Sequence, residues 1–293
     1  MKASGRLMVQ LILLLNRLTP DLNAGMIRSK RSLRAYSDFE YGRAPSTVRL
    51  FGPYFDVAGK DVLDVGCGLG GSERFYLEQG ARSVTAVDLS LPRLAAGRTY
   101  IGETLAQDLP RVLFAEADAR QIAFPDAVFD IIVSTNTFEH IFGVDETLCE
   151  CARILKLGGQ LLIAFPPYHS PWGAHLGNWI RFPWCQVLFS ERALVAAAKH
   201  VEAELRVNSW MPEAIRLDLD GHDQIPHLNR MTVHEFEKTA ASGPLKIVYT
   251  GYNAMGWRSG GRLGKVGQVL AQNERLREYV TSEAVYVLEK PRL

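Results

Sequence analysis

The most informative stretch of the chain is Val62-Leu63-Asp64-Val65-Gly66-Cys67-Gly68-Leu69-Gly70-Gly71. The apolar residues at its start predict a buried strand over Lys60–Val65. The glycines that follow let the backbone turn tightly into a helix, and they let a ligand approach without a Cβ in the way. The amino end of that helix offers free N–H groups and the positive end of a dipole. This stretch therefore predicts a strand, a ligand-binding turn and a helix.

Short apolar runs alternate with amphipathic stretches on the carboxyl side of this turn. Alternation at this spacing is typical of βαβ units, in which helices connect parallel strands. We therefore expect an α/β fold with a Rossmann-like, mostly parallel seven-stranded sheet and helices on both faces. The other six strands are expected at Ser83–Val87, Val112–Glu116, Phe129–Ser134, Gln160–Phe165, Leu245–Thr250 and Glu283–Leu288.

Capping residues predict where several helices begin or end. Gly80 suits the position after a helix over Ser72–Gln79, because glycine adopts the left-handed conformation there. Hydroxyl and carboxylate side chains can accept hydrogen bonds from the first N–H groups of a helix. Helix amino ends are expected on this ground at Ser90, Asp145 and Thr232, and a last helix is expected near Gln268–Val280.

The alternating pattern breaks between Pro166 and about Arg230 and then resumes. Because the sheet continues afterwards, we interpret residues 166–230 as an aromatic-rich insertion after the fifth strand, within one domain over residues 59–293. Residues 1–58 form a basic N-terminal helical arm in this division. Residues 1–60 contain 10 Lys/Arg and 4 Asp/Glu, a net charge of +6, whereas the rest of the chain has a net charge of −5.

Three carboxylates lie at the ends of consecutive predicted strands. Asp64 precedes the glycines, Asp88 lies 22 residues after Gly66, and Asp118 follows the third strand. Ligands of such sheets bind at the carboxyl ends of the strands, and an acid about 20 residues after the glycines accepts hydrogen bonds from ribose hydroxyls. Each acid taken alone also suits a turn or a cap. Together with the glycines, they indicate a nucleoside site.

The charge of the loop separates two classes of nucleoside cofactor. Gly66, Gly68 and Gly71 also satisfy the spacing of dinucleotide-binding loops. A dinucleotide brings a pyrophosphate, which the adjacent Asp64 would repel. A ligand with a cationic ammonium or sulfonium group suits this carboxylate, which favours S-adenosylmethionine over NAD(P).

The same residues carry a resemblance to a known family. The chain resembles the class I S-adenosylmethionine-dependent methyltransferases, most closely the small-molecule branch that includes the ubiquinone and menaquinone methyltransferases. Leu157 stands where the family usually has proline, a departure that should alter turn stiffness and not binding. The matching motifs are Val62–Gly70, Asp88, Asp118-Ala119, Phe129–Ser134, Glu139-His140 and Arg153–Gly159.

The resemblance implies a cofactor site and a reaction. A nucleophile of the acceptor would attack the methyl carbon of S-adenosylmethionine in line, leaving S-adenosylhomocysteine. No metal site is expected, since Cys149 and Cys151 do not share a helix face and His222 and His227 lack further ligands. The implied cofactor-binding residues are Asp64, Gly66, Cys67, Gly68, Gly70, Asp88, Leu89, Asp118, Ala119 and Asn136.

The insertion offers an acceptor pocket. Aromatic walls with a few polar groups suit such a pocket, and they equally suit a hydrophobic mini-core that supports the insertion. Histidine titrates near neutral pH, so the histidines of this region are candidate general bases. The pocket candidates are Tyr168, Trp172, Trp179 and Trp184, and the candidate bases are His140, His169 and His175. Of these, His140 is best placed, at the end of a strand.

The overall charge limits which classes of partner are expected. The chain has 33 basic and 32 acidic residues, a net charge of +1, which disfavours nucleic acid as a partner. A small-molecule or lipid- or sugar-linked acceptor is the leading hypothesis. An RNA or protein methyltransferase, a non-catalytic interaction protein and an NAD(P)-dependent oxidoreductase are the alternatives.

The apolar run Leu7–Leu15 is too short to cross a membrane, which takes about 20 residues. Three interpretations stay open for it: a helix packed on the body, a helix on a membrane surface, or a cleaved signal. Peripheral membrane contact through residues 1–34 would suit the nearby Arg28, Lys30, Arg31 and Arg34. Four cysteines do not make a disulfide scaffold, so we expect a reducing, cytoplasmic location, with or without attachment to a membrane surface.

Overall fold

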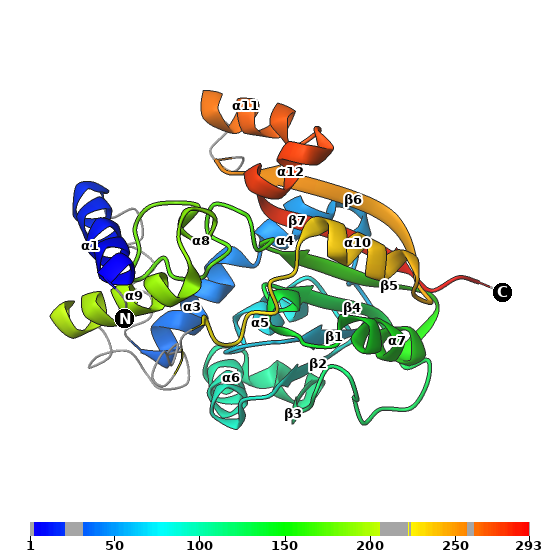
Figure 1. Ribbon diagram of the computed structural model, residues 1–293. Helices are drawn as coiled ribbons and strands as arrows, with labels where there is room; N and C mark the ends of the chain where they lie inside the picture. The colour runs from blue at the N-terminus through cyan, green and yellow to red at the C-terminus, as the bar shows by residue number, and fades with distance from the viewer. Residues whose placement is uncertain (1–2, 21–31, 206–221, 223, 257–260, 293) are drawn as a thin grey trace.

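A seven-stranded sheet forms the centre of the computed structural model, which describes residues 3–20, 32–205, 222, 224–256 and 261–292 (Figure 1). The strand order is β3-β2-β1-β4-β5-β7-β6, and only β7 runs antiparallel to its neighbours. The predicted α/β fold with a mostly parallel sheet is confirmed. The strands are β1 Asp61–Val65, β2 Ser83–Asp88, β3 Val112–Glu116, β4 Phe129–Thr135, β5 Leu155–Phe165, β6 Lys246–Ala254 and β7 Thr281–Glu289.

Helices cover both faces of this sheet, and the described residues also contain three short 3₁₀ helices. The α-helices are α1 Ala3–Leu18, α3 Leu33–Arg43, α4 Ser46–Phe51, α5 Gly71–Glu78, α6 Leu91–Thr104, α7 Val144–Ile154, α8 Cys185–Leu188, α9 Glu191–Leu205, α10 Val233–Ala241, α11 Arg262–Leu270 and α12 Glu274–Val280. The 3₁₀ turns are η1 Gly52–Tyr54, η2 Ala106–Arg111 and η3 Phe138–His140.

Alternate residues of each central strand enter two different cores. In β1, Leu63 and Val65 pack with α7 and α10, whereas Val62 packs with α4, α5 and α6. In β4, Ile132 and Ile131 divide between the same two cores. Strands that are apolar on both sides are therefore continuous hydrophobic runs in the sequence, as expected for a sheet covered by helices on both faces.

The observed helix ends agree with the capping residues in two cases and differ in two. Thr232 caps α10 in a reciprocal capping box with Glu235, and Gly80 after α5 has a φ of +86°. Ser90 occupies the N-cap of α6, but its side chain makes no capping bond. Asp145 does not cap α7. The cap is Gly143, and Asp145 lies in the first turn, where its charge favours the helix dipole.

Two element boundaries also differ from expectation. β5 begins at Leu155 and not at Gln160, because Gly158 and Gly159 exchange backbone hydrogen bonds with Lys290. The expected turn is still visible within the strand, since Gly158 has a φ of +75° and the register with β4 shifts there. The expected last helix divides into α11 and α12. Asn273 causes the division, since its side chain accepts the first N–H groups of α12.

A third hydrophobic cluster joins the start of the chain to the insertion. Ile12 and Leu13 of α1 pack with α9 and with the segment that contains Trp179 (Figure 1). The Asn16 side chain donates to the Trp179 carbonyl at 2.8 Å and accepts from the Arg181 N–H at 2.6 Å. The helix expected over Leu7–Leu15 thus packs on the body. Among the described residues, no helix has the length and apolarity that a membrane crossing needs.

Candidate active site

The glycine loop follows β1 closely and leaves room for a ligand. Gly66, Gly68 and Gly70 have φ values of +79°, +61° and +85°, which side chains with a Cβ rarely adopt. The Gly66 N–H donates to the Val87 carbonyl at 2.8 Å, which ties the loop to β2. A Cβ on Gly66 would lie 2.3 Å from the Thr137 side chain. Glycine is therefore required where β1 and β4 end side by side.

Buried carboxylates lie beneath this loop. Asp64 is 3% exposed and lies beside Glu73 of α5, whose carboxylate is fully buried and accepts no hydrogen bond within the described residues. Burial raises the pKa of Asp64, and burial together with the neighbouring Asp64 raises the pKa of Glu73 well above its usual value. A cationic ligand in front of these groups would favour their ionised forms.

Glu40 of α3 is a further acid at the loop. Its carboxylate accepts a hydrogen bond from the Leu69 N–H at 3.1 Å, and Ser37 of the same helix donates to the Leu69 carbonyl at 2.8 Å. Burial raises the pKa of Glu40 to about 8, although its backbone hydrogen bonds act in the opposite direction. Glu40 belongs to no recognised motif and lies in a basic arm distant from the glycines in sequence, so the sequence alone does not predict its place at the loop.

Asp88 and Asp118 lie at the ends of the next two strands. The Gly68 N–H donates to Asp88 at 3.2 Å, so Asp88 borders the glycine loop as expected. Asp118 pairs with Arg120 at 2.6 Å and also accepts the Arg120 N–H, so it closes a turn. The strand ends remain adjacent, since the Ala117 N–H donates to the Asp88 carbonyl.

Two adjoining cavities lie at this edge of the sheet. The first has a volume of about 260 Å³, and the second, about 280 Å³, is lined in part by Trp172 and Met255. Of the predicted cofactor residues, the first cavity is lined by Asp64, Gly66, Cys67, Gly68 and Asn136, whereas Gly70, Asp88, Leu89, Asp118 and Ala119 do not line it. Both cavities share the residues Arg43, Asn136 and Glu283. Ligands in the two cavities would therefore meet at Asn136.

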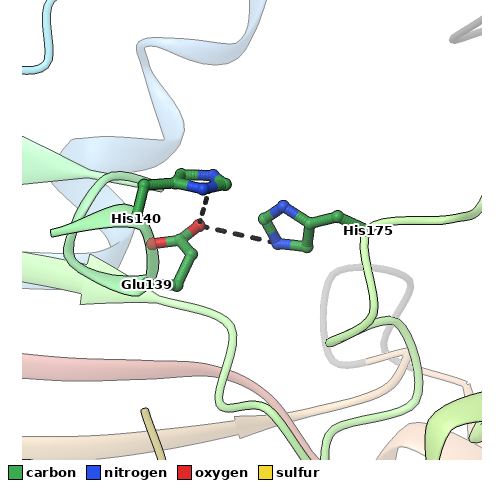
Figure 2. Close-up of side chains that lie close together, drawn as sticks. All are labelled: Glu139, His140 and His175. Carbon is green, nitrogen blue, oxygen red and sulfur yellow. Dashed lines mark ion pairs between the residues drawn. The ribbon is translucent and has the colours of Figure 1, made fainter. Parts of the chain in front are cut away.

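Two of the three candidate histidines lie together around Glu139 (Figure 2). The Glu139 Oε1 atom is 3.9 Å from His140 Nε2 and 3.6 Å from His175 Nε2. Burial lowers the pKa of His140. His169 is not part of the group. Its ring stacks on Tyr279 with the ring centroids 5.6 Å apart.

The predicted pocket aromatics take different positions. Trp172 lines the second cavity. Trp179 is 1% exposed and packs in the hydrophobic cluster of α1 and α9. It therefore belongs to the hydrophobic mini-core of the insertion and not to an acceptor pocket. Tyr168 donates its hydroxyl to Glu191, and Trp184 donates its indole N–H to the Tyr279 carbonyl at 2.7 Å.

Comparison with known proteins identifies the central part of the chain. Residues 63–163 match the methyltransferase domain family. The demethylmenaquinone methyltransferase of Tropheryma whipplei (strain Twist) is 33% identical over 106 residues, which are 36% of this chain and 41% of that protein. A probable chloroplastic tocopherol O-methyltransferase of Oryza sativa subsp. japonica is 32% identical over 104 residues, which are 36% of this chain and 28% of that protein.

A solved structure of an S-adenosylmethionine dependent methyltransferase from Mesorhizobium loti shares the fold. Its TM-score is 0.53 at 15% identity, and the match covers 84% of this chain and 97% of that one. This chain therefore spans less than half the length of the two curated relatives but nearly all of the solved fold. The matched segment contains the glycine loop and Glu139, and it ends where the insertion begins.

Proposed function

From the class I S-adenosylmethionine-dependent methyltransferase domain that this chain contains, we propose that the whole protein methylates a small hydrophobic or lipid-linked acceptor. One observation carries the proposal: the cavity at the glycine loop adjoins a second cavity, and the two share Arg43, Asn136 and Glu283. A donor in the first cavity and an acceptor in the second would have their reacting atoms at this junction.

The first cavity suits the methionine part of the cofactor. Asp64 and Glu40 are anionic partners for the ammonium and sulfonium groups, and Arg43 offers a cation to the carboxylate. Asp88, next to the loop, would accept hydrogen bonds from the ribose hydroxyls. The adenine would extend toward Asp118, at the end of the neighbouring strand.

Direct displacement then needs an aligned nucleophile and a proton acceptor. Holding two reactants in line supplies about 7–11 kcal/mol of the barrier lowering. His140 lines neither cavity, but it follows β4 as Asn136 does and is the candidate base, because burial lowers its pKa and keeps the ring neutral near pH 7. Its Nδ1 lies 2.6 Å from the His227 carbonyl, which can only accept, so Nδ1 carries the proton and Nε2 has the free lone pair.

An apolar stripe on α1 favours a hydrophobic acceptor that is presented at a membrane. α1 has two opposite apolar faces, because one packs with the insertion while a second row of leucines, spaced at four- and three-residue intervals, is exposed. The only charged side chains of α1 are Arg6 and Arg17, so the helix suits an anionic lipid surface. The exposed residues are Leu7 (74%), Leu11 (47%), Leu14 (54%) and Leu18 (73%).

A further observation supports this partner. The two curated relatives are named for tocopherol and demethylmenaquinone, both hydrophobic molecules. Of the N-terminal segment for which we expected membrane contact, residues 1–2 and 21–31 lie outside the described residues.

Calorimetry and a transfer assay test the proposed reaction. We expect the protein to bind S-adenosylmethionine and to transfer its labelled methyl group to a component of a bacterial lipid extract. Label in RNA or protein instead would identify the alternative acceptors. Binding of NADH without binding of S-adenosylmethionine would exclude the proposal, and cofactor binding without any labelled product would indicate a non-catalytic protein.

Vesicle co-sedimentation tests the membrane surface. We expect the full chain to bind vesicles that contain 30% anionic phospholipid and to leave them when Leu7, Leu11, Leu14 and Leu18 are all replaced by serine. Leu276→Ser is the matched control, since Leu276 is 42% exposed on α12, distant in sequence from the stripe. Equal sedimentation of the quadruple variant and the control would show that α1 does not contact lipid.

A further inference from the structure

Three metal-ligating side chains converge at the turn that follows β4. Glu139 and His140 belong to the η3 turn after β4, and His175 comes from the insertion (Figure 2). Each offers one ligand atom, and these atoms all lie within 4.8 Å of one another. Ligands of one zinc ion at about 2.0–2.2 Å stand roughly 3.4 Å apart in a tetrahedral site. The separations of 3.6 and 3.9 Å from Glu139 to the two imidazoles come within a few tenths of an ångström of that value.

The His140 ring has the kind of hydrogen-bond partner that usually orients a metal-binding histidine. Metal-binding histidines donate their other ring N–H to a carbonyl or carboxylate, which fixes the tautomer and aims the lone pair. His140 donates from Nδ1 to the His227 carbonyl at 2.6 Å and directs Nε2 toward Glu139. Asn229 fixes the same turn, because its side chain donates to the carbonyls of Phe138 and Ile141 at 2.7 and 2.6 Å.

Glu139 is the least satisfied member of the group. Its side chain is 4% exposed, and within the described residues neither carboxylate oxygen accepts a hydrogen bond. Buried carboxylates without partners are unfavourable and are normally paired or bound to a metal. His175 adds a second sign of constraint, because its φ of +55° is rare for a residue with a Cβ.

We propose that Glu139, His140 and His175 form a zinc site. Two imidazoles and one carboxylate are a donor set of catalytic zinc, which leaves at least one position for water or a ligand. The side chains of His140 and His175 are 37% and 26% exposed, so the ion would have access from solvent. The sequence expectation of no metal did not consider this group, because His175 is 35 residues beyond His140.

The site has a consequence for the proposed reaction. A zinc ion held by these residues would occupy the His140 lone pair, so His140 would then act as a ligand and not as the base. The ion would instead lower the pKa of an acceptor hydroxyl, whose proton would pass to solvent water. This consequence rests on the proposed function, whereas binding of the ion does not. Zinc binding is therefore measured in the absence of S-adenosylmethionine and of any acceptor.

Zinc titration of the EDTA-treated and dialysed full chain tests the site. We expect one equivalent of Zn²⁺ to bind, and His175→Asn to weaken binding by at least about 100-fold, beyond the roughly 10- to 100-fold effect of losing a supporting group. Asparagine is chosen because it tolerates the left-handed backbone at this position. His200→Asn is the matched control, since His200 pairs with Glu204 at 3.1 Å without a second histidine in the pair.

A second variant and a spectroscopic measurement distinguish loss of the zinc site from misfolding of the variant. Glu139→Gln keeps the size of the side chain and should also abolish stoichiometric zinc binding, while both variants retain binding of S-adenosylmethionine by calorimetry. Co²⁺ in the wild-type site should give the visible absorption of a low-coordinate ion. If wild-type protein bound no more zinc than His175→Asn, or if the two active-site variants and His200→Asn bound it equally, the three residues would be an ion-paired cluster and not a metal site.

Discussion

The glycine-loop edge of the sheet and the insertion differ in how their residues are brought together. At the glycine loop, Asp64, Asp88 and Asp118 lie at or just beyond the carboxyl ends of β1, β2 and β3, and parallel pairing of adjacent strands places those ends side by side. In the insertion, Trp179 is held by Asn16 from α1, and His175 lies against the η3 turn. The arrangement of residues at the glycine loop can be predicted from local periodicity. The arrangement in the insertion depends on contacts between segments far apart in sequence.

The proposed active site therefore has two halves, a cofactor half and an acceptor half. The glycine loop supplies most of the backbone that would hold a cofactor, so changes in the insertion should leave cofactor binding intact. The acceptor side combines residues of α3, the insertion and β7, so it should change with any of them. Substitutions in each half test whether cofactor binding is independent of the acceptor side.

Gly66→Ala should disrupt the cofactor half. The substitution places a Cβ 2.3 Å from Thr137 on a backbone with a φ of +79°. Left-handed strain and overpacking together should lower the free energy of unfolding by about 3 kcal/mol. We also expect the affinity for S-adenosylmethionine to fall by about 100-fold, because the loop must shift. Denaturant unfolding and calorimetry measure the two effects.

The matched control is Gly102→Ala in α6. A Cβ at Gly102 would lie 3.8 Å from Leu109, an ordinary contact, and φ there is not in the left-handed region. Alanine within a helix should raise the unfolding free energy by about 0.5–1 kcal/mol and leave cofactor affinity unchanged. Equal effects of the two substitutions on unfolding free energy and cofactor affinity would show that the loop conformation is not needed for cofactor binding.

Glu191→Gln should disrupt the insertion half. Glu191 accepts hydrogen bonds from Tyr168, from the Ile225 N–H and from Arg230, with which it forms a 2.6 Å ion pair. Loss of its charge leaves the partly buried Arg230 without its counterion and should cost about 1–2 kcal/mol of unfolding free energy. Methyl transfer should fall while S-adenosylmethionine affinity stays within twofold, as calorimetry and the transfer assay would show.

Glu274→Gln is the control for the same chemical change at an exposed position in α12. It should leave activity unchanged and lower the free energy of unfolding by only about 0.3–1 kcal/mol, because Glu274 lies in the first turn of the helix. A large loss of cofactor affinity in Glu191→Gln would contradict the independence of the two halves.

The pH dependence of cofactor binding should depend on Glu40. Its pKa is raised to about 8 in the unliganded protein, and a nearby cation favours the ionised form. Binding then releases a proton, so affinity should rise by about tenfold between pH 6 and pH 8 and level off above pH 8. Glu40→Gln should reduce the rise, with a deficit at pH 8 and near-equality at pH 6, while Asp64, whose pKa is raised to about 7, should preserve part of it. A steep profile in the variant would assign the proton to another group.

The sequence predicted the sheet and the glycine loop well, because strand period and glycine conformation are local properties. Asp64 and Gly66 both line the first cavity, and their role in binding a cofactor stays a prediction. Glu40 was missed because only the packing of α3 on α5 brings it to the loop. The insertion was less predictable for the same reason: Trp179 and Trp172 are alike in sequence, yet one packs with α1 and the other lines a cavity.

The smallest expected effect concerns the two faces of α1. Leu14→Ser removes an exposed side chain and should change the unfolding free energy by less than about 0.5 kcal/mol. Ile12→Ala on the opposite, fully buried face should cost about 2–4 kcal/mol, because it leaves a cavity against α9. Chemical denaturation of the two variants measures the contrast. Comparable losses would mean that the exposed stripe is covered in solution by the protein itself, which would remove it as a membrane surface.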